Sequence, residues 1–293
     1  MCIAAIAWQL FDELPLVILS NRDEFLQRPT TSAHQWSDLP IYAGRDDQSG
    51  GTWLGMHQQP LQSEQPESPN HSESSNYSDK IFSQNGRWAA VLNFRDGVQA
   101  EPDQHSRGEL VTHFLTSDLS PLAYARQVGL QAYAGFNLII GDEKQAVVVN
   151  NRGYPPTPLH SGLHIISNGQ PDDAWFKSER LRGRVRQEVL PLISESLEFH
   201  QGDSNYWLPA AWNVLNDTLQ APDEQLPDTG MPPALEQALS SICIDTPELP
   251  NYGTRTQSIL TLALLADSAQ QDKPLPKLDL RSREYVTQHS LRD

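Results

Sequence analysis

The sequence has 293 residues, enough for one large domain or two small ones. Its formal net charge of −16 disfavours binding to nucleic acid or to anionic membrane surfaces, because like charges repel. The two cysteines lie far apart in the chain, which fits a reducing cytosol better than a disulfide framework. No apolar run approaches the roughly 20 residues of a membrane span, and the short apolar start lacks the basic region of a signal peptide. We therefore expect a cytoplasmic protein with neither nucleic-acid nor integral-membrane partners.

The first 25 residues predict a hairpin. Residues 2–8 and 14–19 form two mainly apolar runs joined by a polar, acidic connection. Runs that are apolar at both odd and even positions are typical of strands buried on both faces. If the two runs pair antiparallel, we expect Cys2 to lie opposite Asn21, with the polar turn 21–24 beside the start of the chain.

Cys2 is the first candidate for chemistry. Initiator methionine is commonly removed when residue 2 is small, and Cys2 would then carry both a thiol and a free α-amine. Their reference pKa values, about 8.5 and about 7.7–8.0, let one group deprotonate the other near neutral pH. A positive charge on Arg22 would favour the thiolate. The residues alone leave an alternative open, in which Cys2 is a small hydrophobic residue of a buried strand and 21–24 is a solvated turn.

Blocks of sequence spread from residue 1 to about residue 260 carry a resemblance to a known family. In chain order they are Met1-Cys2-Ile3, Asn21-Arg22-Asp23-Glu24-Phe25 with Arg28-Pro29-Thr30, Ala43-Gly44-Arg45-Asp46 with Gly50-Gly51-Thr52-Trp53-Leu54-Gly55, Leu92-Asn93-Phe94-Arg95, Ser167-Asn168-Gly169, and Tyr252-Gly253-Thr254-Arg255-Thr256. This set resembles the NRDE family (transport and Golgi organisation protein 2-like), named for the tetrapeptide. That family is in turn similar to the N-terminal nucleophile (Ntn) hydrolases, nearest to the cysteine-type amidases that include bile salt hydrolase and penicillin V acylase.

The resemblance implies a fold and a site. The fold class is α+β, a four-layer αββα sandwich of two mainly antiparallel sheets, formed as a single domain over residues 1–293. The implied catalytic residues are Cys2, Arg22, Asp23, Asn93, Asn168 and Arg255, and the implied substrate-binding residues are Asn21, Arg45 and Trp53. One feature departs from the amidases, which space their arginine and aspartate three residues apart. Neighbours on a strand face opposite ways, so Arg22 and Asp23 can both reach Cys2 only if the chain is irregular there.

Asn93 and the loop that contains Arg45 are interpreted from their place in predicted elements. The strand 87–93 ends at Asn93, where the amide would donate to an oxyanion, as an asparagine does in the amidases; on the residues alone, Asn93 is also a turn former. The loop 44–51, between short strands at 41–43 and 52–55, ends in two glycines. It is either a tight hairpin turn or a rim of the cleft near Cys2.

The rest of the chain predicts one insertion and two outer layers of helices. Residues 57–85 are rich in Ser, Gln, Asn, Glu and Pro, and we interpret them as a polar insertion, mobile over about residues 60–78. The periodicity predicts helices at 106–115, 120–124, 173–192, 205–219 and 232–239, and strands at 135–141, 145–150, 163–168, 241–244 and 258–265, with an edge strand near 280–286.

No metal or cofactor site is indicated. Ser161-Gly162 separates His160 from His164 and a strand follows, so the two histidines would not share a helical face. The sequence has no HExxH, CxxC or phosphate-loop motif. Three functions compete: hydrolysis of a small amide or acyl (thio)ester by Cys2, haem or lipid/acyl-CoA binding and trafficking on the same scaffold without turnover, and a scaffold that binds a protein partner. We take the hydrolase as the expected function, with a small-molecule substrate and no cofactor.

Overall fold

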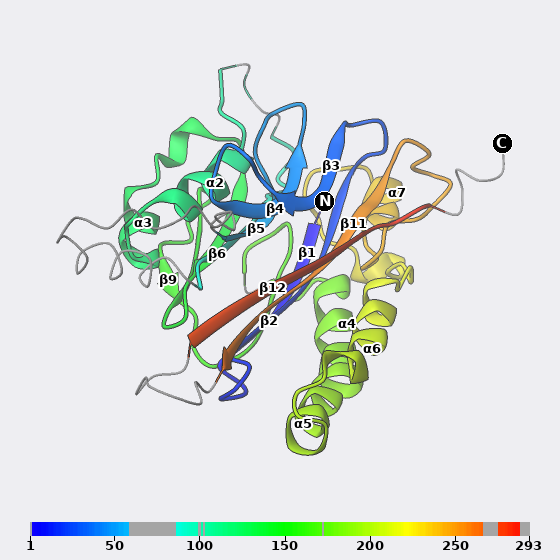
Figure 1. Ribbon diagram of the computed structural model, residues 1–293. Coiled ribbons are helices and arrows are strands. Elements are labelled where there is room, and N and C mark those ends of the chain that lie inside the picture. The colour runs from blue at the N-terminus through cyan, green and yellow to red at the C-terminus, as the bar shows by residue number, and fades with distance from the viewer. Residues whose placement is uncertain are drawn as a thin grey trace.

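The computed structural model describes residues 2–58, 86–98, 101, 103–171, 173–265 and 275–287. Two antiparallel sheets lie face to face between two layers of helices (Figure 1). The first sheet has the strand order β10-β1-β2-β11-β12. Its strands are β1 (Cys2–Trp8), β2 (Leu16–Phe25), β10 (Gly162–Ile166), β11 (Tyr252–Leu265) and β12 (Leu275–Glu284).

The second sheet has seven strands in the order in which the chain visits them. They are β3 (Thr30–Gln35), β4 (Ile41–Asp46), β5 (Leu54–His57), β6 (Trp88–Asn93), β7 (Phe136–Gly141), β8 (Ala146–Asn150) and β9 (Thr157–Pro158). The helices are α2 (Gly108–Thr116), α3 (Pro121–Gln127), α4 (Phe176–Arg184), α5 (Leu190–Phe199), α6 (Leu208–Leu215) and α7 (Pro233–Ala238), with a π-helical turn (Val185–Val189) that joins α4 to α5.

Alternation along each central strand divides the apolar side chains between two cores. In β1, Cys2, Ala4, Ile6 and Trp8 face the second sheet, whereas Ile3, Ala5 and Ala7 face the helical layer formed by α4, α5 and α6. A third core joins α2 and α3 to the outer face of the second sheet. The predicted four-layer α+β sandwich is therefore confirmed.

The predicted register of the first hairpin was wrong by one residue. Cys2 is paired with Arg22, and Asn21 is paired with Ile3. The connection begins at Gln9, which has a positive φ of 49° and donates its backbone N–H to the Pro15 oxygen at 2.7 Å. A slip of one residue exchanges the two faces of a strand, so Arg22 rather than Asn21 lies on the same face as Cys2.

Other local predictions are also corrected. Residues 21–24 are not a turn, because they continue β2 as far as Phe25. Residues 241–244 are buried but form no strand; the Cys243 amide instead donates to the Asp217 oxygen and the Ile244 amide donates to Thr254 Oγ1. His57 closes β5 and is buried, so it belongs to the sheet and not to the polar insertion. The remainder of the predicted insertion, residues 59–85, lies outside the described residues.

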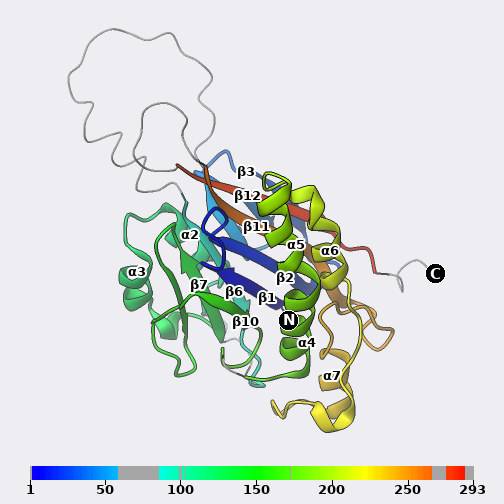
Figure 2. The same ribbon diagram turned by 90° about the horizontal axis from the view of Figure 1, so that it is seen from below.

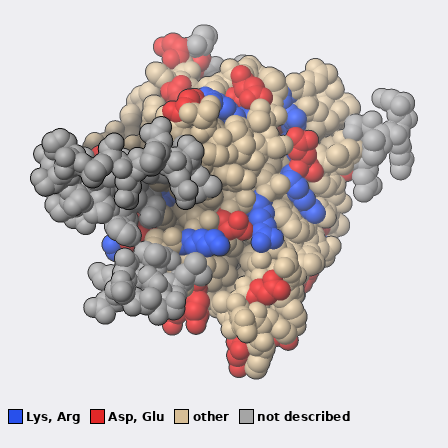
Figure 3. All heavy atoms as spheres, viewed as in Figure 1, with Lys and Arg blue, Asp and Glu red and all other residues tan. Residues whose placement is uncertain are grey.

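Helix α7 was expected to complete the outer layer beside α6. It lies apart from α5 and α6, beyond the end of α4 (Figure 2). Among the described residues, no helix is long and apolar enough to cross a membrane. Basic and acidic side chains are interspersed on the face of the molecule drawn in Figure 3.

Candidate active site

A pocket of about 510 Å³ opens where the first hairpin ends. Five of the residues singled out from the sequence line it, namely Cys2, Arg22, Asp23, Trp53 and Asn93. Its remaining wall comes from the end of β2 and the segment after it, from residues 46–52, from β6, from the start of α2, from the region around α7, and from Leu249 and Tyr252. Segments far apart in the sequence therefore converge on Cys2.

Cys2 lies at the first position of β1, 9% exposed, on the face between the two sheets. Burial raises the pKa of its thiol, and the negative charge of Asp23 raises it further. The positive charges of the chain's N-terminus and of Arg22 act in the opposite direction and lower this pKa, as does a backbone hydrogen bond from Asp23. The thiol is therefore not a spontaneous thiolate at neutral pH, and its use as a nucleophile requires a base.

Arg22 is held rigidly beside Cys2. Its Nη2 lies 3.0 Å from Asp46 Oδ2, and its guanidinium lies 4.3 Å from the centroid of the Trp53 ring. Arg28 shares the same carboxylate, with Nε 2.6 Å from Asp46 Oδ2. A Cβ on Gly44 would lie 2.5 Å from the Trp53 ring, so glycine at that position lets the indole lie beneath Arg22.

Asp23 also reaches the pocket, because the pairing of β2 with β11 is irregular at this point. Thr254 pairs with Asp23 and Thr256 with Arg22, so Arg255 is the extra residue of a β-bulge in β11. Thr254 Oγ1 donates to Asp23 Oδ1 at 2.5 Å. Burial raises the pKa of Asp23 to about 6, while the positive charges of the N-terminus and of Lys177 lower it.

Asn93, at the end of β6, is connected to two buried side chains. Asn168 Nδ2 donates both to the backbone oxygen of Asn93, at 3.0 Å, and to its side-chain oxygen, at 3.1 Å. Asn168 Oδ1 in turn accepts a hydrogen bond from Lys177 Nζ at 2.7 Å. The β1–β10 register, extended by two residues from Ala4–Ile166, places Asn168 across from Cys2.

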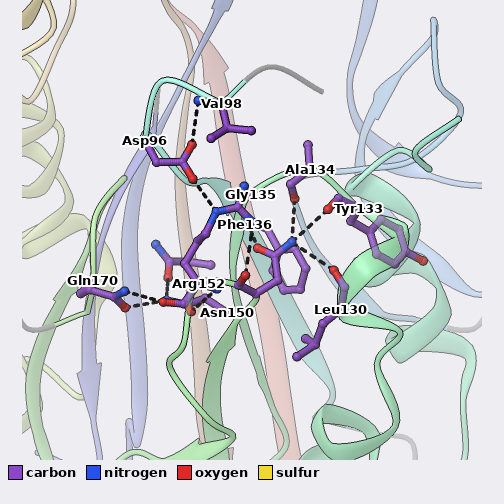
Figure 4. Close-up of polar contacts among 12 residues, drawn as sticks. Asp96, Val98, Leu130, Tyr133, Ala134, Gly135, Phe136, Asn150, Arg152 and Gln170 are labelled. Carbon is purple, nitrogen blue, oxygen red and sulfur yellow. Dashed lines mark hydrogen bonds and ion pairs between the residues drawn. The ribbon is translucent and has the colours of Figure 1, made fainter. Parts of the chain in front are cut away.

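A polar network fixes the segment that carries Asn168. Asn150 Nδ2 donates to Gln170 Oε1 at 2.9 Å, and Gln170 Nε2 donates to the Arg152 oxygen at 2.8 Å. Arg152 also pairs with Asp96, three residues after Asn93 (Figure 4). The network ties the chain after β6 and the chain after β10 to the same end of β8, which holds Asn93 and Asn168 in place.

Four sequence candidates do not line the pocket: Asn168, which contacts Asn93, and three residues that lie elsewhere. Asn21 faces the helical side, where its Nδ2 donates to the oxygens of Leu215 and Ile242, each at 2.8 Å. Arg45 forms a bidentate pair with Asp38 and lies over the Trp36 ring. Arg255 donates to the backbone oxygen of Arg28 and so contacts the pocket wall from behind. Asn21, Arg45 and Arg255 therefore stabilise the fold around the pocket.

Sequence reasoning missed Asp46, Arg107 and Lys177. Asp46 was part of a recognised block, but its neighbour Arg45 was preferred. Arg107 precedes α2 and lines the pocket because Gly108 packs against the 51–52 backbone, where a Cβ on Gly108 would lie 2.9 Å from the Thr52 nitrogen. Lys177 lies in the helix predicted at 173–192 and was not singled out, yet it is 2% exposed. The one available signal was its position four residues before the buried Leu181, which puts it on the apolar face of the helix.

These features define a class of protein: an antiparallel αββα sandwich with a cysteine at the start of a central strand and an Arg-Asp pair beside it at a pocket. The Transport and Golgi organisation 2 family model matches residues 1–62 and 81–267, and the chain belongs to that family. The chain is 30% identical over 301 residues to the Transport and Golgi organization protein 2 homolog of Homo sapiens, with 93% of each chain covered. It is 29% identical to the Mus musculus homolog over the same length, and 25% identical over 304 residues to an uncharacterized protein of Saccharomyces cerevisiae, covering 90% of this chain and 88% of that one.

Proposed function

We propose that this protein hydrolyses a small amide or acyl (thio)ester, with Cys2 as an N-terminal nucleophile of the cysteine-amidase type. The observation that carries the proposal is the convergence of Cys2, Arg22, Asp23 and Asn93 on one pocket. A thiol, a fixed cation, a carboxylate and an amide are the groups that acyl transfer through a cysteine uses.

The first step needs a proton acceptor, because burial raises the pKa of the Cys2 thiol. Removal of Met1 would place the α-amine on Cys2 itself, where it can accept the thiol proton. Asp23 would then stabilise the resulting ammonium, and Arg22 the thiolate. The thiolate bonds to the acyl carbon, and the C–N bond breaks as the amine proton passes to the leaving nitrogen. Water then cleaves the thioester, which releases the acid and restores the thiol.

Asn93 is the proposed oxyanion donor. It ends a strand beside Cys2, and its side-chain oxygen is already engaged by Asn168 at 3.1 Å. The amide nitrogen is therefore the group turned away from Asn168. One donor of this kind contributes about 10²–10³ in rate, because it acts on charge that develops in the transition state.

The pocket wall favours an apolar acyl group. Besides the polar residues, the pocket is lined by apolar and aromatic side chains, namely Phe25, Val91, Leu92, Met231, Leu235, Leu239, Leu249 and Tyr252. Such a surface gains free energy by burying an acyl chain. The same wall also supports a second candidate, a carrier of haem or of a lipid or acyl-CoA that binds without turnover.

Paired substitutions separate catalysis from binding. In the hydrolase, Cys2→Ser lowers turnover by orders of magnitude while affinity stays near that of the wild type, because the hydroxyl keeps the shape but is a far weaker nucleophile. Asn93→Ala then lowers kcat by about 10²–10³ with little change in affinity. If the protein is a carrier, both substitutions change its affinity for the ligand, and neither the wild type nor the variants show turnover. N-acyl amino acids, acyl-CoA thioesters and penicillin V are the probes.

The proposal extends to organisation and location. We propose that residues 1–293 form one domain into which the polar segment is inserted, since both sheets contribute to one shared core. We also propose a cytoplasmic protein without nucleic-acid partners, a resident metal or a cofactor. The two unpaired cysteines and the net charge of −16 support this assignment.

A further inference from the structure

We propose that Lys177 is a positioning residue of this site, which fixes the amide orientation of Asn93 through Asn168 and holds a positive charge beside Cys2. The part that concerns Asn93 rests on the proposed function. Lys177 is the second residue of α4 and belongs to none of the sequence blocks that indicated the site.

The placement of Lys177 is unusual for a lysine. Its side chain is 2% exposed, although a lysine is almost never fully buried unless it is paired. Its Nζ donates to Asn168 Oδ1 at 2.7 Å. Burying a charge in this way is costly, so a buried lysine calls for a specific explanation.

The hydrogen-bonding capacity of lysine supplies one. An ammonium group has hydrogen-bond donors and no acceptor, so it can pair only with the oxygen of the Asn168 amide. Asn168 must therefore turn its NH₂ group toward Asn93, where it meets Asn93 Oδ1 at 3.1 Å. That contact fixes the second amide as well, with its NH₂ group turned away from Asn168. The two ends of an isolated asparagine amide have nearly the same shape, so its orientation is ambiguous. Here Lys177, which only donates, and the backbone oxygen of Asn93, which only accepts, require the same orientation of Asn168, and Asn168 passes it on to the Asn93 amide.

The charge of Lys177 acts on the same place. The groups that interact with it electrostatically are Cys2 on β1, Asp23 on β2, Arg95 after β6 and Glu236 on α7. Burial lowers the pKa of Lys177 to about 7, and Arg95 lowers it too, while Asp23, Cys2 and Glu236 raise it. Arg95 is itself paired with Glu236 at 3.0 Å. At pH 7 about half of the Lys177 side chains therefore carry a positive charge, which favours the ionised forms of Asp23 and Cys2 and is lost as the pH rises.

The test compares Lys177→Met, which removes the donor and the charge, with Lys177→Arg, which keeps both. Lys144→Met is the matched control, because Lys144 is a lysine 82% exposed on the β7–β8 turn. Two rates are measured on the full chain: acylation of Cys2 by p-nitrophenyl acetate, and alkylation of Cys2 by iodoacetamide across pH 6–10. The first rate depends on an oxyanion donor, and the second depends on the thiolate alone.

We expect Lys177→Met to slow acylation by about tenfold or more, even at pH values chosen to give equal alkylation rates, because Asn93 is no longer held. We also expect its alkylation profile to move to higher pH, while Lys177→Arg and Lys144→Met stay near the wild type. A folded Lys177→Met protein that acylates and alkylates like Lys144→Met would overturn the inference.

Two further outcomes are informative. If Lys177→Met does not fold, Asn168→Ala replaces it: the link from Lys177 to Asn93 is lost, so acylation should fall about tenfold at pH values chosen to give equal alkylation rates. Unchanged acylation would overturn the role in orienting Asn93. If the wild type forms no acyl-enzyme, the proposed function fails, and the alkylation profile alone decides the charge role: a shift in Lys177→Met supports it and an unshifted profile overturns it.

Discussion

Cys2 and Arg22 are paired residues of β1 and β2, on the face of the first sheet that is turned toward the second. The pairing places a thiol and a guanidinium side by side at the open end of a hairpin. Asp46 fixes the guanidinium from the second sheet at 3.0 Å. The position of the thiol beside the guanidinium thus depends on strand register in one sheet and on the last residue of β4 in the other.

The two cysteines should differ in reactivity. Cys243 is fully buried, and burial raises the pKa of its thiol to about 12, whereas Cys2 lines a pocket beside Arg22. We expect iodoacetamide to modify Cys2 much faster than Cys243 at pH 7, and intact mass to show a chain that begins at Cys2. Peptide mapping of the labelled protein measures both. Equal, slow labelling would indicate a structural Cys2, and retained Met1 would remove the α-amine as the base.

Asp23 should make stability depend on pH. Its folded pKa of about 6 lies above the ordinary value of 3.8, so between these values the folded state holds a proton that the unfolded state has lost. This contribution to stability is therefore lost as pH rises from about 4 to about 6. Asp23→Asn removes it, and the variant should gain about 2–3 kcal/mol on the wild type across that window. Urea unfolding at pH 4 and pH 7 measures the gain; a difference that does not change with pH would contradict the assignment.

The buried pair of Arg95 and Glu236 should support the apolar wall. Both side chains are 2% exposed and lie 3.0 Å apart, and Glu236 belongs to α7, whose Leu235 lines the pocket. Glu236→Ala leaves a buried arginine without its carboxylate, so we expect a loss of about 3–5 kcal/mol on chemical denaturation. The exposed Glu224→Ala is the control and should change stability little. A small loss in both variants would mean that the pair does not hold α7.

Deleting residues 60–78 should leave the fold intact. The strands on either side are already joined, because β5 pairs with β6 and the His57 amide donates to the Arg87 oxygen at 2.9 Å. The family model also matches on both sides of this stretch, omitting residues 63–80. Urea denaturation should give the same midpoint within error for the full chain and the deletion variant. A loss of several kcal/mol would show that the segment packs against the sandwich.

The four-layer arrangement was predictable from the family resemblance, and runs that are apolar on both faces indicated that the first two strands are buried. The hairpin register was not, since it depends on the left-handed conformation of Gln9 in a connection with no glycine there. Whether Arg45 or Asp46 points toward the pocket depends on which face of β4 is turned toward the first sheet, and only the assembled sheet shows this. Residues 241–244 looked like a strand because they are mostly apolar. Their amides instead form single hydrogen bonds to the Asp217 oxygen and to the Thr254 side chain.

Within the site, local sequence indicated Cys2, Arg22, Asp23 and Asn93, and the structure brings them to one pocket. Lys177 could not be found in this way. Its burial results from the packing of α4 against the chain after β10, and nothing in the residues next to it marks that contact.

Mass spectrometry of the acyl-enzyme tests the central claim most directly. The protein is incubated with N-acyl amino acids, acyl-CoA thioesters and penicillin V, quenched in acid, and mapped for an acyl group on residue 2. Nucleophilic attack by Cys2 predicts an adduct on that residue in the wild type and its loss in Cys2→Ala. An adduct that persists undiminished in Cys2→Ala would contradict the hydrolase, and the absence of an adduct with every probe would favour the carrier.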